Sequence, residues 1–354
     1  MIFSPIQIAN LNVSNRIAVA PMCQYSSVDG AMTDWHTQHL MQLGYSGAGL
    51  IMVEATAVER IGRITHHCVG LYNDFCERSI KKTLEKARSV SQKETAFGIQ
   101  LAHAGRKAST QRPWEGRKSL SKEEDPWSTK GPSSLAFDED WHVPETIENS
   151  DLENIKSKFV EASLRSVRVG FDLIEIHGTH GYLFHQFLSP LSNHRSDKYG
   201  GSLENRMRYP LEVFAAIKQA LPKDFPLGMR ITGTEWEKGG IDEQEAIIFA
   251  NELEKIGCHY VCVSSGGNTP NPKIPIAPHY QVHLAKIIKK NTDMVVRAVG
   301  MITDPIKANQ IIVDKEADMV AIARGFLTNP RWVWDAAKIL KHDIKVPPQY
   351  ARKF

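Results

Sequence analysis

The strongest constraint on the fold of this chain is a regular alternation of short apolar runs with longer amphipathic segments. Eight runs have the length and composition of buried β-strands, at residues 17–20, 50–53, 96–101, 171–177, 227–231, 260–264, 294–299 and 319–323. Segments of helical period follow them in turn, at residues 34–43, 74–91, 151–169, 203–220, 242–256, 280–290, 305–313 and 331–340. Eight successive β-then-α units predict a closed (β/α)8 TIM barrel, an α/β fold.

A doubly wound open sheet is the alternative fold. It commonly has fewer strands and a glycine-rich first turn, whereas no G-x-G-x-x-G sequence follows the first strand here. The 354 residues are a normal length for one barrel. We therefore expect a single domain over residues 1–354, ending in a C-terminal tail at residues 344–354.

The connection at residues 110–143, after the third strand, is much longer than the others. It is rich in polar residues but also contains Trp114, Trp127 and Trp141. Long connections in compact domains are usually functional or disordered. The tryptophans favour a packed, lid-like insertion over a floppy linker.

Charge and cysteine content narrow the class of protein. Lys and Arg total 43 against 40 Asp and Glu, a net charge of +3, which argues against a nucleic-acid partner. The five cysteines include no Cys-x-x-Cys pair, as expected in a reducing compartment. The N-terminus has no signal-peptide pattern, and no apolar stretch approaches the roughly 20 residues that span a bilayer. We therefore expect a cytoplasmic protein with no membrane partner.

Charged side chains within the strands need partners. In a barrel, reactive residues lie at the C-terminal ends of the strands, and period-two alternation puts Glu175 and His177 on one face of the fourth strand. A buried carboxylate needs a charged or hydrogen-bonding partner, so we expect Glu54 or Glu175 to pair with Arg230. A buried ion pair that only orders the barrel is an equally good interpretation for the two glutamates.

His177 ends the fourth strand and His180 lies just beyond it, and the two form the most distinctive pair. A metal-dependent barrel hydrolase is one interpretation, but zinc needs a third ligand and usually a His-Glu-x-x-His helix or a His-x-His strand, and neither is present. Two adjacent imidazoles could instead hold an anionic or carbonyl oxygen. Tyr182, two residues later, has a phenol that can donate a proton. We expect no metal at this site.

Three other strand ends have functional potential. Cys23 follows the first strand, where a lone cysteine is more often inert than nucleophilic. Gly300 and Arg324 follow the seventh and eighth strands, a common position for phosphate binding in barrels. Glycine permits a close backbone approach, and arginine offers a charged fork.

Several segments are specific enough to suggest a family. They are residues 20–25 (APMCQY), 98–106 (GIQLAHAGR), 177–183 (HGTHGYL), 187–193 (FLSPLSN), Arg195, 199–202 (YGGS) and 204–206 (ENR). Together they resemble the Old Yellow Enzyme family of FMN-dependent ene-reductases over nearly the whole chain. The similarity is greatest to the branch with a cysteine after the first strand, the thermophilic-like NADPH dehydrogenases and xenobiotic reductases.

The resemblance implies an FMN across the barrel mouth, with its phosphate near Gly300 and Arg324. Arg230 would stabilise the negative charge of the reduced ring, and Cys23 would tune its potential rather than act as a nucleophile. The implied cofactor contacts are Ala20, Pro21, Met22, Cys23, Ala55, Gln100, His177, Arg230, Gly300, Ala323 and Arg324. The family often has Gly-Arg where this chain has Ala323-Arg324.

The resemblance also implies substrates and a mechanism. His177 and His180 would bind the carbonyl or nitro oxygen of an activated alkene, Tyr25 would help to hold it, and Tyr182 would protonate its α-carbon. NADPH or NADH would react first in the same pocket, giving ping-pong kinetics. Enones, nitroalkenes and quinones are the implied substrates. A catalytically silent, flavin-holding protein is the remaining alternative.

The end of the chain bears on assembly. Gln349-Tyr350-Ala351-Arg352 resembles a tail that places an arginine in the active site of a neighbouring subunit, so Arg352 is a further candidate for substrate binding. This implies a homodimer or a dimer of dimers. The larger relatives that reduce dienoyl-CoA have a cysteine-rich iron–sulfur segment, and no such cluster is present here.

Overall fold

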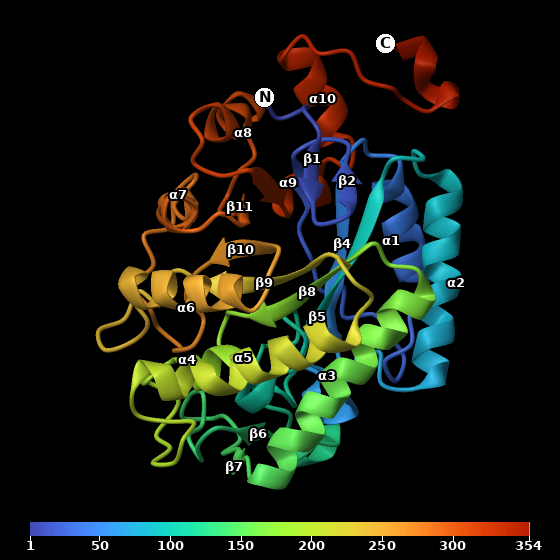
Figure 1. The fold of residues 1–354 in the computed structure, drawn as a ribbon. Helices are drawn as coiled ribbons and strands as arrows, with labels where there is room; N and C mark the ends of the chain where they lie inside the picture. The colour runs from blue at the N-terminus through green and yellow to red at the C-terminus, as the bar shows by residue number, and fades with distance from the viewer. Residues whose placement is uncertain (354) are drawn as a thin grey trace.

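The computed structural model describes residues 1–353 and contains a closed barrel of eight parallel strands (Figure 1). The strands follow one another around the barrel in chain order, as β3 (Ile17–Val19), β4 (Leu50–Ala57), β5 (Ala96–Ala102), β8 (Leu173–Gly178), β9 (Leu227–Thr232), β10 (Tyr260–Ser264), β11 (Val295–Ala298) and β12 (Met319–Ile322). The predicted TIM barrel is confirmed.

Eight helices follow these strands, within a few residues of the predicted segments. They are α1 (Asp34–Gly44), α2 (Asp74–Val90), α3 (Asn149–Val169), α5 (Leu203–Ala220), α6 (Glu243–Lys255), α7 (Val282–Asn291), α8 (Pro305–Val313) and α10 (Trp332–Ile339). Side-chain caps fix several starts: Ser202 accepts from the Asn205 amide and Asp304 from the Lys307 amide, which satisfies backbone donors that the first turn leaves free.

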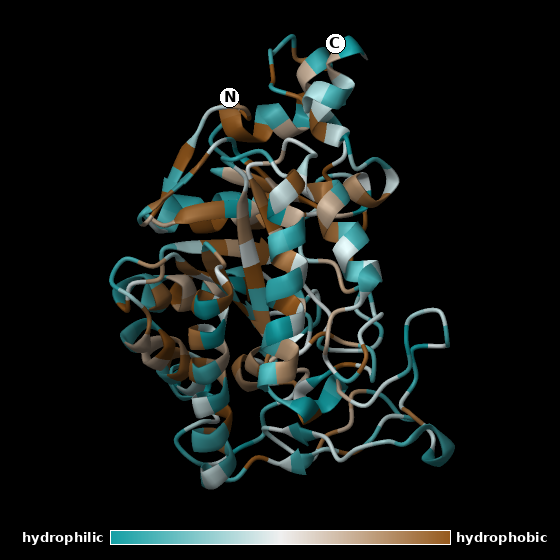
Figure 2. Ribbon diagram, turned by 90° about the vertical axis from the view of Figure 1, so that its right-hand side faces the viewer, coloured by the Kyte–Doolittle hydropathy of each residue, from teal (hydrophilic) through white to brown (hydrophobic). Residues whose placement is uncertain are grey.

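Apolar side chains form two layers of core. One layer lies between the strands and the helices, and the other fills the barrel. Figure 2 shows the hydrophobic strands inside, with helices whose outward faces are more hydrophilic. None of the helices in residues 1–353 is long and apolar enough to cross a membrane.

A short hairpin at the N-terminus closes one end of the barrel. The strands β1 (Ile6–Ile8) and β2 (Leu11–Val13) pair antiparallel, and Ile8 and Val13 join the inner core with Leu50 and Met319. Figure 1 shows the hairpin at the end opposite β6 (Lys130–Gly131) and β7 (Glu145–Thr146). This hairpin and two short helices, α4 (Leu183–Leu188) and α9 (Arg324–Thr328), were not predicted from the sequence.

The barrel interior corrects one expectation about charge. Arg297 on β11 donates to a carboxylate oxygen of Glu175, and Gln100 donates to the other at 2.8 Å. Glu54 instead accepts from the Gln24 amide at 3.0 Å and lies 3.4 Å from His36. The predicted pairing of Glu54 or Glu175 with Arg230 is therefore wrong. Arg230 is in register with His177, two residues beyond Glu175, so it lies nearer the mouth of the barrel.

The long connection at residues 110–143 packs onto the barrel at several points. Trp127 donates its indole N–H to the Ile61 carbonyl at 2.9 Å, and the Arg63 guanidinium lies 5.4 Å from its ring. β6, within this connection, pairs with β7 just beyond it. Trp141 contacts Phe137 edge-on at 4.7 Å, whereas Trp114 is 62% exposed.

Candidate active site

The C-terminal ends of the strands meet below a cavity of about 740 Å³. Tyr25, His180 and Tyr182 line it from the strand ends, and Phe137 and Trp141 line it from the long connection. A further wall comes from the loop after β10, at residues 267–276. The cavity therefore joins two of the predicted substrate-binding residues, Tyr25 and His180, to the predicted lid-like segment, while His177 is not among the residues that line it.

Three aromatic side chains at the end of β8 and in the turn after it form one cluster. The ring of His177 lies 5.2 Å from that of His180 and 4.8 Å from that of Tyr182, edge-on in both cases. The Thr179 amide donates to Nδ1 of His177 at 3.3 Å, so the proton of a neutral His177 is on Nε2. Burial, and then the charge of Arg230, hold the pKa of both histidines well below the ordinary value. Both rings are therefore neutral at physiological pH.

His180 is held by partners that the sequence analysis did not single out. Its Nε2 lies 2.8 Å from the Ser264 hydroxyl, and its carbonyl accepts from Lys107 Nζ at 3.0 Å. Burial, and next the nearby Arg106, lower the pKa of Lys107 to about 7. The sequence feature that could have identified Lys107 as a site residue is its position directly after the family-like segment at residues 98–106.

The two tyrosines of the site remain protonated. Burial is the largest cause of the raised pKa of both Tyr25 and Tyr182. Tyr25 adopts a positive φ of 48°, a conformation that costs a non-glycine residue about 1–2 kcal/mol. Trp114 contacts its ring edge-on at 5.9 Å. Phenols in this state can donate protons but cannot act as bases.

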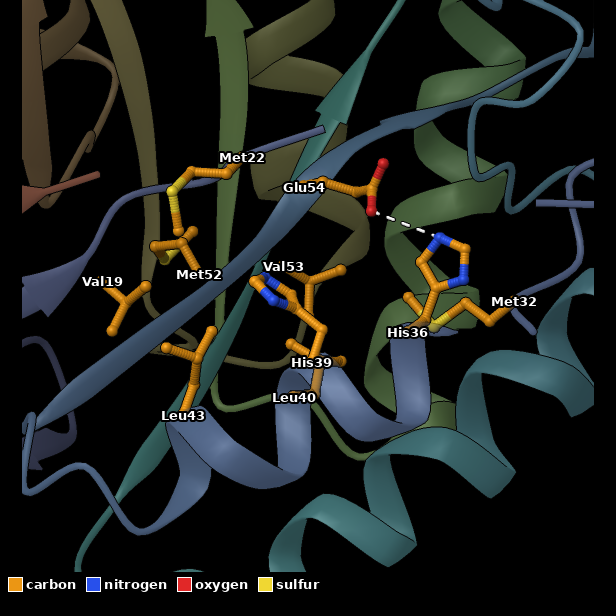
Figure 3. A pocket seen from close by; sticks show the side chains of 10 residues that line it. All are labelled: Val19, Met22, Met32, His36, His39, Leu40, Leu43, Met52, Val53 and Glu54. Carbon is orange, nitrogen blue, oxygen red and sulfur yellow. Dashed lines mark ion pairs between the residues drawn. The ribbon is translucent and has the colours of Figure 1, made fainter. Parts of the chain in front are cut away.

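Cys23 is partly exposed beyond β3, next to Tyr25. Burial, followed by the charge of Glu54, raises the pKa of its thiol well above the ordinary value. Figure 3 shows Glu54 facing His36, while the side chain of Met22 points toward Met52 and Val19. The side chain of Met22 is therefore partly buried and packs against the core. A protonated thiol is a weak nucleophile, and the tuning role of Cys23 stays a prediction.

The remaining predicted cofactor contacts lie around the same end of the barrel. Ala55 and Gln100 are register partners on β4 and β5, after an irregularity in β4. Ala20 and Pro21 follow β3, Gly300 follows β11, and Ala323 precedes α9. Gly300 has a φ of 117°, a conformation that L side chains rarely adopt.

Two arginines make this end suitable for FMN. Within residues 1–353, the Nε of Arg230 is buried and has no hydrogen-bond partner, and its Nη2 has only a 3.4 Å contact with Ser264. Arg324 is exposed at the start of α9, and no ion pair is formed by its side chain within the described chain. An unpartnered buried donor favours an acceptor from a ligand. The residues present thus fit a flavin with an anionic phosphate.

Arg352 lies at the other end of the molecule. Its segment, η4 (Pro348–Lys353), has Tyr350 stacked on Tyr45 and edge-on to Trp334. Figure 1 shows this tail at the end of the molecule that contains the N-terminal hairpin. The structure therefore does not bring Arg352 to the cavity of its own chain, and its role at a neighbouring subunit stays a prediction.

A metal site was the alternative use of His177 and His180. Across residues 1–353, no group of three or more His, Cys, Asp and Glu side chains is arranged to hold a metal ion. The third ligand that this interpretation required is therefore not found in the described part of the chain.

Comparisons with known proteins agree with this arrangement. Residues 1–343 match the NADH:flavin oxidoreductase / NADH oxidase family. The chain is 41% identical to an NADH:flavin oxidoreductase of Gibberella zeae, over 98% of this chain and 88% of that protein. It is 39% identical to the NADPH dehydrogenase of Bacillus subtilis, over 99% and 98%. Morphinone reductase in complex with tetrahydroNAD matches with a TM-score of 0.78 at 25% identity, over 98% of this chain and 93% of that one.

Proposed function

Because the chain belongs to the NADH:flavin oxidoreductase / NADH oxidase family, and is thus an FMN-dependent oxidoreductase of the Old Yellow Enzyme type, we propose that it reduces activated C=C bonds. The substrates would be α,β-unsaturated carbonyl compounds, nitroalkenes and quinones, with NADPH or NADH as the reductant. The observation that carries this proposal is the cluster of two neutral imidazoles, of His177 and His180, with the protonated phenol of Tyr182.

FMN would be held around the barrel mouth by the strand-end residues. Arg230 would hold the ring through its unpartnered guanidinium donors, while Gly300, Ala323 and Arg324 would hold the phosphate. When bound, the flavin would supply the hydride chemistry between the nicotinamide and the alkene. Since both reactants would use one cavity, we expect ping-pong kinetics.

The chain's own contribution is to bind, orient and protonate the alkene. Nε2–H of His177 would donate to the carbonyl or nitro oxygen, and His180 would provide the second contact. A hydrogen bond to a developing oxyanion is worth about 3 kcal/mol. The phenol of Tyr182, next to His177, would give its proton to the α-carbon, and Tyr25 would hold the opposite side of the substrate.

The decisive experiment uses the purified holoenzyme. A yellow preparation should release FMN on denaturation and oxidise NADPH or NADH with 2-cyclohexenone. Changing His177→Ala together with His180→Ala should leave FMN bound and lower cyclohexenone turnover by about 100-fold or more, because oxyanion stabilisation is lost. Tyr182→Phe should slow reoxidation by the enone more than reduction by NADPH.

Three outcomes would contradict the proposal. A wild-type protein that binds FMN but reduces no enone, nitroalkene or quinone would indicate the silent, flavin-holding alternative. Unchanged turnover in the double variant would refute the role of the histidines. Equal slowing of both half-reactions by Tyr182→Phe would argue against Tyr182 as the proton donor.

A further inference from the structure

The turn that contains His180 and Tyr182 is held in place by side chains. It joins β8 to α4, and His180 and Gly181 have φ values of 59° and 73°. Glycine adopts a positive φ readily, but an L residue such as His180 rarely does, so the turn at His180 needs restraints from outside. The Gly181 carbonyl accepts from Gln186 Nε2 at 2.7 Å, and the His180 carbonyl accepts from Lys107.

The amide of Gly181 has its own dedicated acceptor. It donates to Nδ1 of His185 at 2.8 Å, and Nε2 of His185 lies 2.5 Å from the Glu235 carboxylate. Because Nδ1 accepts, the proton of a neutral His185 is on Nε2 and is donated to Glu235. The side chains of His185 and Glu235 are 0% and 1% exposed. The carboxylate thus fixes both the tautomer and the orientation of the ring.

Glu235 is itself firmly placed. It follows β9 and accepts from Ser189 Oγ at 2.9 Å and from Asn268 Nδ2 at 3.2 Å. Burial alone would raise the pKa of its carboxyl, but His185 and Ser189 together lower the pKa below the ordinary value. The group is therefore ionised at neutral pH. Neither Glu235 nor His185 lines the cavity, so any effect on a substrate must act through the turn.

The same network continues into the walls of the cavity. A Cβ on Gly181 would lie 2.2 Å from the Gly267 carbonyl, so the loop after β10 packs directly on the turn. The carbonyl of Asn268, in that loop, accepts from Arg106 at 2.7 Å. Arg106 also donates to the carbonyls of Leu135 and Ala136 in the long connection. The turn and the long connection thus share one set of buried partners.

We propose that His185 and Glu235 are positioning residues that hold the His180–Tyr182 turn in its strained conformation, so that both side chains face the substrate oxygen and α-carbon. This inference rests on the proposed function for the roles of His180 and Tyr182. The geometry of the turn itself does not depend on that function. Its restraint can therefore be measured separately.

Three variants of the holoenzyme test whether His185 and Glu235 restrain the His180–Tyr182 turn. His185→Leu removes the acceptor for the Gly181 amide, His185→Asn keeps an oxygen close to the Nδ1 position, and Glu235→Gln removes the charge that orients the ring. Glu245→Gln is the matched control. It alters another largely buried ion pair, the 2.6 Å contact with Arg206 on α5, which does not line the cavity.

Hydrogen exchange of the peptide at residues 178–188 is the first readout. His185→Leu and Glu235→Gln should speed its exchange by about tenfold or more, and His185→Asn should restore much of the protection. The second readout is kcat/KM for 2-cyclohexenone at unchanged FMN content. It should fall by about 100-fold in His185→Leu, the size of loss that a 1 Å misplacement can cause. The Glu245→Gln control should change neither.

The outcomes distinguish this inference from the proposed function. Unchanged exchange at 178–188 in both His185→Leu and Glu235→Gln would overturn the positioning role. Faster exchange over the whole barrel would overturn it as well, because it would show a general loss of stability. If His185→Leu does not fold, Glu235→Gln and His185→Asn provide the same comparison. A wild type without enone turnover would refute the proposed function, while the exchange measurements would still decide the positioning role.

Discussion

Burial sets the protonation state of the individual side chains in the candidate active site. The pKa values of His177 and His180 are depressed and that of Tyr182 is raised. None of these groups is expected to titrate between pH 6 and 9. Lys107 is the exception, because its pKa is lowered to about 7.

We therefore expect the pH dependence of enone turnover to follow Lys107. Below pH 7 its ammonium is charged, and a positive charge near the substrate oxygen stabilises the developing negative charge. The rate of the oxidative half-reaction should fall a few-fold as pH rises through about 7. In Lys107→Met the profile should be flat at the lower level, as stopped-flow measurements can check. An inflection that persists in the variant would belong to another group.

Cys23 offers a second test at this scale. Its raised pKa keeps the thiol protonated, so Cys23→Ser should shift the midpoint potential of the bound flavin and retain turnover. Potentiometric titration of the holoenzyme measures the shift, with the buried Cys258→Ser as a control that should leave the potential unchanged. Loss of turnover with FMN still bound would instead favour a nucleophilic role.

Sequence alone located strand-end side chains better than it located their partners. His177, Tyr182 and Arg230 could be placed because alternation and strand ends are local patterns. The partner of Glu175 could not, because Arg297 comes from a distant strand and only the closed barrel brings the two together. Lys107 was missed for the same reason: its carbonyl partners, on His180 and Gly267, come from loops far along the chain.

At the scale of elements, the eight β/α units were predictable because each contains at least a full period of its pattern. The hairpin strands have three residues each, as β3 does, but no amphipathic helix follows either of them, and α4 and α9 have six and five residues. Such short elements contain too few residues to define a period, so tertiary contacts decide them. The helix boundaries differed by a residue or two, as expected for frayed ends.

The contact between β8 and β11 gives a prediction for stability. Glu175 and Arg297 are both 0% exposed, so Glu175→Gln would leave the Arg297 guanidinium without its counter-charge. Loss of one partner of a buried pair typically costs about 3–5 kcal/mol in the free energy of unfolding. Urea unfolding of the apoprotein measures this, and Glu245→Gln, with a 25% exposed side chain, should cost less. An equal loss of stability in both variants would show that the buried pair in the barrel contributes no more than a partly exposed pair.

At the scale of the whole molecule, the barrel has one open end. The hairpin closes the other, and side chains fill the interior throughout the described chain. Under the proposed function, nicotinamide and alkene would compete for one cavity, so high NADPH should inhibit enone reduction competitively. Initial rates over a grid of both concentrations should give parallel double-reciprocal lines at low NADPH and inhibition at high NADPH. Intersecting lines would indicate that both bind at once.

The closed end of the barrel also has a consequence for how reactants enter and products leave. If the cavity opens only at the mouth of the barrel, the alkene cannot enter until the nicotinamide has left. Under the proposed function, departure of the oxidised nicotinamide sets a ceiling on turnover that no improvement in hydride transfer can raise. Substitutions at residues 267–276, which form one wall of the cavity, should therefore change the turnover number by altering the rate at which the oxidised nicotinamide is released.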